Sequence, residues 1–115
     1  MGKVVERIVN AERVEDLLAQ MTLEEKAGLM FHTITGVNPD GSLDPPPAGF
    51  SRDPIAELVE HRLMNHFNVH ALPAPDIAAT WHNRLQALAE GTRLGIPALI
   101  HQEALNGFMA GGHMV

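Results

Sequence analysis

Short strand-forming segments alternate with amphipathic helices along this chain, and only a few folds are compatible with that order. Residues 31–35, 67–71 and 96–100 are rich in β-branched, aliphatic or aromatic side chains, which indicates three strands. Helical patterns over residues 53–63 and 75–91 separate these strands. A strand–helix–strand order of this kind predicts parallel pairing within one sheet. We therefore predict an α/β fold.

Two further helices are predicted before the first strand. One covers residues 11–20, with Asn10 as a candidate N-cap. Its apolar side chains recur at helical spacing: Val14, Leu17, Leu18 and Met21. The other helix begins at a capping box, in which the Thr22 hydroxyl accepts the N–H of Glu25 and the Glu25 carboxylate accepts the N–H of Thr22.

A long Pro- and Gly-rich segment, residues 36–52, interrupts this order after the first strand. Its Pro39-Asp40-Gly41 stretch predicts a turn. A loop of this length inside a compact domain is either functional or disordered, and we leave both interpretations open. The helix that follows is predicted to begin with Asp53 as N-cap and Pro54 at its first position.

The composition excludes several classes of function. The 115 residues carry a formal net charge of −6 and no Lys/Arg-rich block, which argues against a nucleic-acid partner. The absence of cysteine excludes disulfides and thiolate metal sites. No apolar run has the length of a membrane span, and no signal peptide is evident. We expect a soluble, cytoplasmic protein that has no membrane partner, although a longer precursor could be exported.

A polar cluster follows the last predicted strand and is the leading candidate for a functional site. In the stretch IPALIHQEALNG, residues 96–107, the aliphatic run ends in His101, Gln102 and Glu103. A carboxylate accepts several hydrogen bonds, which suits neighbouring hydroxyls of a sugar. The alternatives are a helix cap or an ion pair for Glu103, and a hydrogen-bonded core position for His101 or Gln102.

Two other features have a functional and a structural interpretation. His61, His66 and His70 recur at five and four residues, which raises the question of a zinc site. We favour scattered solvated histidines and predict no metal and no cofactor. Trp81 is either a sugar-stacking platform or a core residue, and we favour the core because it lies on a helical stripe: Ile77, Trp81, Leu85 and Leu88.

Two stretches resemble the N-terminal domain of glycoside hydrolase family 3: RVEDLLAQMTLEEKAGLM, residues 13–30, and NHFNVHALPAPDIAATWHNRLQALAEGTRLGIPALIHQEALNG, residues 65–107. The resemblance implies a TIM-type (β/α)8 barrel, of which residues 1–115 would form only the N-terminal portion. Such barrels place function at the C-terminal ends of their strands. Glu103 matches the family's carboxylate that contacts sugar hydroxyls. Asn106 stands where many members have histidine.

The resemblance further implies an exo-acting, retaining β-glucosidase or β-xylosidase. The family's nucleophilic Asp lies on a later strand, and its acid/base Glu comes from a second domain. We therefore assign no catalytic residue here, name Glu103, His101 and Gln102 as substrate-binding, and expect the chain alone to be inactive. In a barrel, residues 36–52 would lie on the active-site rim.

Two rival hypotheses come from other classes. The chain could be a non-catalytic assembly module whose incomplete sheet pairs with a second chain, since proteins rarely leave a sheet edge uncovered. It could also be a histidine-based metal hydrolase, which would require three histidine or carboxylate ligands to converge.

Overall fold

The computed structural model describes the backbone of residues 2–47, 53–70, 72–102, 109–110 and 113–114, and the side chains from residue 10 to residue 102 within these ranges. The principal elements, in chain order, are α1 (Gly2–Gln20), α2 (Leu23–Gly28), β1 (His32–Thr35), the π-helix η1 (Glu57–His61), β2 (His66–Val69), α3 (Pro75–Glu90) and β3 (Leu99–His101). Two short strands, β4 (Met109–Ala110) and β5 (His113–Met114), pair antiparallel with each other.

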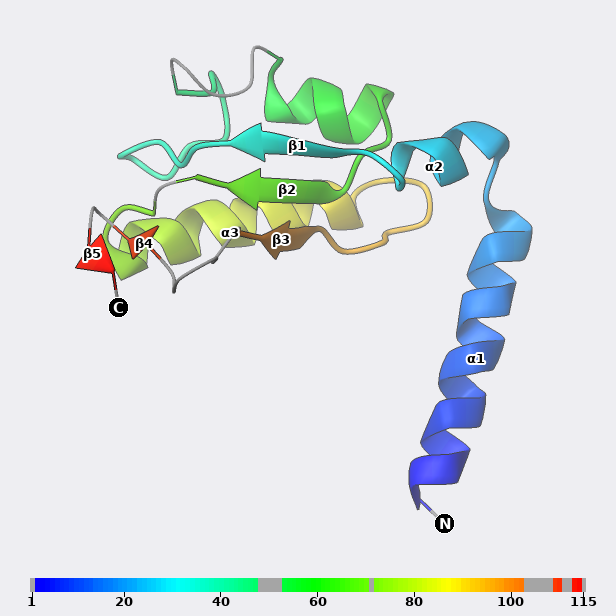
Figure 1. Cartoon of the computed structure of the whole chain (residues 1–115). Helices are drawn as coiled ribbons and strands as arrows, with labels where there is room; N and C mark the ends of the chain where they lie inside the picture. The colour runs from blue at the N-terminus through cyan, green and yellow to red at the C-terminus, as the bar shows by residue number, and fades with distance from the viewer. Residues whose placement is uncertain (1, 48–52, 71, 103–108, 111–112, 115) are drawn as a thin grey trace.

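The three main strands form a parallel sheet in the order β1-β2-β3, so each strand lies beside its neighbour in the sequence. Figure 1 shows the three strands pointing the same way, with α3 running alongside them. The register pairs His32 with His66 and Asn68 with His101. The predicted α/β class and parallel pairing are confirmed.

The hydrophobic core lies on one face of this sheet. Phe67 and Val69 of β2 are buried there against side chains from the two helical segments that follow β1 and β2. The helical residues of the core are Ile55, Leu58, Val59, Trp81, Leu85 and Ala89. Both helical segments thus cover the same face, because alternate side chains of a strand point to opposite sides. Trp81 is 1% exposed, which confirms its predicted core position.

The opposite face of the sheet is bare of helices in the described part of the chain. We call it the open face, and its side chains alternate with those of the core: His32, Ile34, His66, Asn68, Leu99 and His101. Ile34 and Leu99 are 46% and 51% exposed. Apolar side chains of a parallel strand are normally covered on both sides. The open face therefore lacks a covering layer.

The N-terminal region differs from its prediction at one boundary. The capping box of Thr22 and Glu25 is confirmed, with both hydrogen bonds present at 2.8 and 3.2 Å. Helix α1, however, begins at Gly2 and continues through Asn10, which we predicted to be its N-cap. Asparagine costs an α-helix only a few tenths of a kcal/mol relative to better helix formers, so one such residue need not end it. Figure 1 shows α1 projecting away from the sheet.

The helix after the Pro-rich segment is shorter and less regular than predicted. Its first N–H groups, those of Ile55 and Ala56, donate to the carboxylate of Asp44 at 2.6 and 3.1 Å. A carboxylate eleven residues upstream thus supplies capping that we had assigned to Asp53. The π-helical hydrogen bond from Arg62 N to Glu57 O then closes the segment. Helix α3 agrees with its prediction, with Pro75 first and Gly91 as C-cap.

The described part of residues 36–52 contains no helix or strand but is closely hydrogen-bonded. Asn38 Nδ2 donates to the carbonyls of Ser42 and Pro45 at 3.1 and 2.8 Å. The predicted turn is confirmed by a 2.9 Å bond from Gly41 N to Asn38 O. Gly41 has a φ of +70°, a conformation that glycine adopts without strain. No helix within the described residues has both the length and the hydropathy to cross a membrane.

Candidate functional site

The candidate site lies where strands β2 and β3 end. His101 is the last residue of β3, and Gln102 follows it. Gln102 Nε2 donates to the carbonyl oxygen of Val69, the last residue of β2, at 2.9 Å. The structure thus brings two of the predicted site residues to the C-terminal edge of the sheet, while Glu103 lies outside the described residues.

Three histidines gather on the open face, where His32 and His66 begin β1 and β2 and His101 ends β3. The rings of His32 and His66 are stacked, with centroids 4.7 Å apart and planes 8° apart. The ring of His101 is tilted by 56° against that of His32 at 5.0 Å. Each ring comes from a different strand, and the parallel register brings all three to one side of the sheet.

Several polar atoms of this cluster are buried and have no hydrogen-bond partner among the described residues. They are His66 Nδ1, Asn68 Oδ1, His101 Nε2 and Gln102 Oε1. Buried polar atoms in folded proteins are almost always hydrogen-bonded, because leaving one unpaired costs about 1–3 kcal/mol. Four such atoms on neighbouring residues therefore indicate a place where a further group completes the hydrogen bonding.

The electrostatics of the cluster act on His66. Burial lowers the pKa of His66 below its ordinary value, and the nearby His32 and His101 lower it further. A second charge in this group would repel the first at close range. Both effects favour the uncharged form of the His66 ring.

The described residues of the Pro-rich segment begin directly after β1 and thus also start at the C-terminal edge of the sheet. The carboxylate of Asp40 accepts from Ser42 N and Oγ at 2.9 and 2.7 Å, and these bonds lower the pKa of Asp40. Val37 is buried in the core. The segment is therefore anchored to the body of the molecule up to residue 47.

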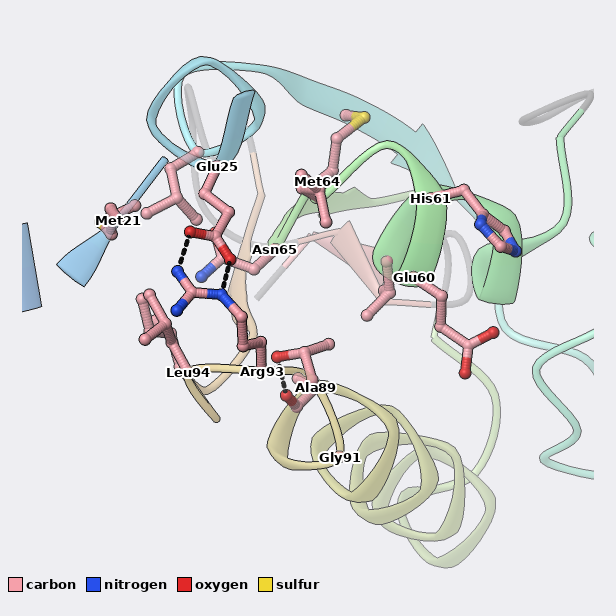
Figure 2. A pocket seen from close by; sticks show the side chains of 15 residues that line it. Met21, Glu25, Glu60, His61, Met64, Asn65, Ala89, Gly91, Arg93 and Leu94 are labelled. Atoms are coloured by element: carbon pink, nitrogen blue, oxygen red, sulfur yellow. Dashed lines mark hydrogen bonds and ion pairs between the residues drawn. The ribbon is translucent and has the colours of Figure 1, made fainter. Parts of the chain in front are cut away.

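A pocket of about 470 Å³ lies at the other end of the strands (Figure 2). Its walls include Leu29 before β1, Asn65 before β2 and Ile96 before β3, so it opens at their N-terminal ends. His61 also lines it. None of the sequence-predicted site residues in the described chain reaches this pocket, and the two sites are separate.

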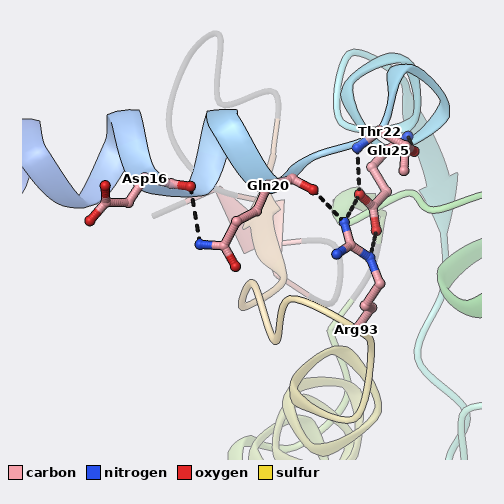
Figure 3. Close-up of polar contacts among 5 residues, drawn as sticks. All are labelled: Asp16, Gln20, Thr22, Glu25 and Arg93. Atoms are coloured by element: carbon pink, nitrogen blue, oxygen red, sulfur yellow. Dashed lines mark hydrogen bonds and ion pairs between the residues drawn. The ribbon is translucent and has the colours of Figure 1, made fainter.

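An ion pair beside this pocket joins three parts of the chain (Figure 3). The Arg93 guanidinium donates to both carboxylate oxygens of Glu25 and, at 2.8 Å, to the carbonyl oxygen of Gln20 at the end of α1. The bond from Arg93 is the main cause that lowers the pKa of Glu25, and the N–H of Thr22 adds to it. These contacts hold the α1–α2 junction against the loop after α3.

Sequence reasoning named His101 and Gln102 as site residues, assigned no role to His32 or Asn68, and considered His66 only together with His61 and His70. Spacing along the chain linked His66 to His61 and His70, whereas the sheet places it beside His32 and His101. Only the strand register carries this information. Among the described residues, no three His, Asp or Glu side chains are arranged to hold a metal ion.

Comparison with known proteins shows which proteins the chain is similar to. No protein-family model matches the chain. It is 41% identical over 103 residues to "Probable beta-glucosidase C" of Aspergillus flavus, and 39% identical over 102 residues to "Beta-glucosidase C" of Emericella nidulans. It is also 36% identical over 106 residues to "Periplasmic beta-glucosidase/beta-xylosidase" of Dickeya chrysanthemi.

The chain is homologous to a segment of β-glucosidases and β-xylosidases. The similarity covers 84% to 90% of this chain but only 15% to 16% of these three relatives. The resemblance inferred from residues 13–30 and 65–107 is thereby confirmed. The chain is thus a glycosidase-like segment about one sixth as long as these three relatives.

Proposed function

We propose that the chain is the N-terminal portion of a (β/α)8 barrel domain in an exo-acting β-glycosidase, which removes terminal non-reducing β-linked sugars. The observation that carries this proposal is the 41% identity over 103 residues with a protein named β-glucosidase. A carbohydrate is accordingly the substrate that we propose.

The sheet supports the barrel part of this proposal. Its strands follow one another in chain order, and both helical segments cover one face. A doubly wound sheet instead places helices on both faces and reverses its strand order at the ligand site. In a barrel, the helix-covered face turns outward and the bare face turns inward. On this proposal, the open face lines the inside of the barrel.

The proposed role of this segment is to bind the sugar rather than to break the bond. A retaining glycosidase uses two carboxyl groups about 5–5.5 Å apart, one as nucleophile and one as acid/base. By the family resemblance, both come from outside residues 1–115. Glu103 would accept hydrogen bonds from two sugar hydroxyls, and the unpaired Nε2 of His101 and Oε1 of Gln102 would take part beside it.

The relatives favour this proposal over both rivals. They are named as glycosidases, which a non-catalytic assembly module does not explain. The metal hydrolase needs convergent ligands, and the described part of the chain offers no such group.

A hybrid enzyme tests the proposal. The 103 matched residues of the Aspergillus flavus relative would be replaced by the matching residues of this chain, and hydrolysis of an aryl β-glucoside would be measured. We predict that the folded hybrid hydrolyses the substrate, whereas the isolated 115-residue chain does not. A folded hybrid without activity would contradict the proposal. Turnover by the isolated chain would contradict the assignment of both catalytic carboxyl groups to residues outside this chain.

The Glu103→Ala variant of the hybrid tests the assigned sugar contact. Losing a hydrogen-bonded charged group should cost about 1.5–3 kcal/mol, which lowers kcat/KM by roughly 10- to 150-fold. Glu90→Ala is the matched control, because Glu90 is exposed at the end of α3. Equal effects of the two substitutions on kcat/KM would show that Glu103 makes no specific contact with the sugar.

A further inference from the structure

Two polar atoms of the open face that lack a hydrogen-bond partner in the described chain lie at adjacent positions of β2 and β3. Asn68 is only 7% exposed, yet its Oδ1 has no hydrogen-bond partner in the described part of the chain. Its register partner on β3 is His101, whose Nε2 is also buried and unpaired. Both side chains lie on the open face within one residue of the C-terminal ends of their strands. The two unpaired atoms therefore belong to adjacent positions at one edge of the sheet.

The chemistry of these atoms limits what can bind. A carboxamide oxygen only accepts hydrogen bonds, while the nitrogen of a neutral imidazole either donates or accepts, according to its tautomer. An anion would meet the oxygens of Asn68 and Gln102, both unpaired acceptors. A cation would meet imidazoles rather than carboxylates in the described part of the cluster. A neutral hydroxyl matches both atoms, since it donates to one and accepts from the other.

The neighbouring rings restrict the position of His101. The ring of His32 on β1 lies against the ring of His101 on β3. It is also stacked on the ring of His66 on β2. These contacts reduce the freedom of the imidazole before any ligand arrives, and preorganised polar groups bind at a lower entropic cost.

We propose that Asn68 and His101 form a specificity-determining pair that binds a hydroxyl group of a neutral sugar beside Gln102. This inference rests on the proposed glycosidase function for the nature of the ligand. It adds Asn68, to which the sequence reasoning assigned no ligand role, and it assigns the acceptor in the pair to Asn68 Oδ1.

The test uses the 115-residue chain labelled with 15N and titrated with D-glucose and, separately, with D-xylose. We expect the largest chemical-shift changes at the His101 ring nitrogens and the Asn68 side-chain amide for at least one sugar. Shifts confined to Thr92 and Leu94, which line the pocket at the other end of the strands, would overturn the proposal. So would the absence of shifts at both residues.

Two substitutions at one position separate the acceptor role from packing. Asn68→Leu removes the acceptor oxygen and should weaken sugar binding by about tenfold or more, the loss expected for a buried hydrogen bond. Asn68→Asp keeps an acceptor oxygen in nearly the same place and should retain binding. Asn83→Leu, on an exposed position of α3, is the matched control. Loss of binding in Asn68→Asp, or full binding in a folded Asn68→Leu, would refute the assignment.

The outcomes distinguish this inference from the proposed function. An active hybrid enzyme combined with no sugar response at Asn68 or His101 would refute the pair and leave the glycosidase proposal standing. Sugar binding at both residues combined with an inactive folded hybrid would support the pair and contradict the enzyme.

Discussion

Trp81 and His66 show how far individual side chains can be understood from their immediate surroundings. The helical stripe on which Trp81 lies predicted a core residue, and the structure confirms it. No local pattern predicted the contacts of His66, because its neighbours come from other strands. Residues whose role follows from local periodicity were predictable, whereas those defined by strand register were not.

Trp81→Ala should destabilise the chain by about 3–5 kcal/mol, because it removes a large side chain from a closely packed core. Urea denaturation followed by circular dichroism would measure the change in the free energy of unfolding. His82→Ala, one residue along on an exposed position, should stay within about 0.5 kcal/mol. A similar loss in both variants would show that Trp81 has no special role in the core.

Acidification should weaken the fold through His66. The folded state lowers the pKa of His66, so the unfolded chain binds a proton more readily. Its stabilising contribution is therefore present above about pH 6.5 and is lost as the pH falls through the lower pKa of the folded state. Urea midpoints measured between pH 7.5 and 5 should fall less in His66→Gln than in the parent chain. His82→Gln is the control, and equal pH dependence in all three chains would argue against this role.

At the scale of elements, the order of helices and strands was predictable but several boundaries were not. The alternation of segments correctly indicated parallel strands and the long α3. The early start of α1 and the capping of the segment before η1 by Asp44 depend on weak propensities and on a contact across eleven residues. Neither leaves a clear local signal, since capping rules look only one to three residues away.

Arg93 should control the junction between α1 and α2. Its guanidinium binds the Glu25 carboxylate in a two-point contact and reaches Gln20 O, a geometry that the single ammonium of lysine cannot reproduce. Arg93→Lys should therefore speed the exchange of the Thr22 amide hydrogen, which donates to Glu25. Arg84→Lys serves as the control, because the Arg84 guanidinium donates at 3.5 Å to Asp40 O, away from this junction. Unchanged exchange in Arg93→Lys would show that the junction holds without the guanidinium.

At the scale of the whole molecule, the described structure has a single core, a bare sheet face and an outlying helix. The core is formed by one side of the sheet and the helices that cover it. The open face carries exposed Ile34 and Leu99 together with the unpaired atoms of the histidine cluster. A partial layer of this kind fits a segment about one sixth as long as its relatives. The family resemblance implied that the chain forms only part of a barrel, but the sequence did not indicate which face of the sheet would be bare.

Chemical modification of His32 tests directly whether the open face turns inward in a barrel. His32 is exposed in this chain, so diethyl pyrocarbonate should modify it readily, as it should modify the exposed His82 of α3. In the folded hybrid with the Aspergillus flavus relative, we predict that His32 becomes protected while His82 reacts as before, with modification measured at each site by mass spectrometry. Equal reactivity of His32 in the isolated chain and in the hybrid would show that no barrel closes over this face.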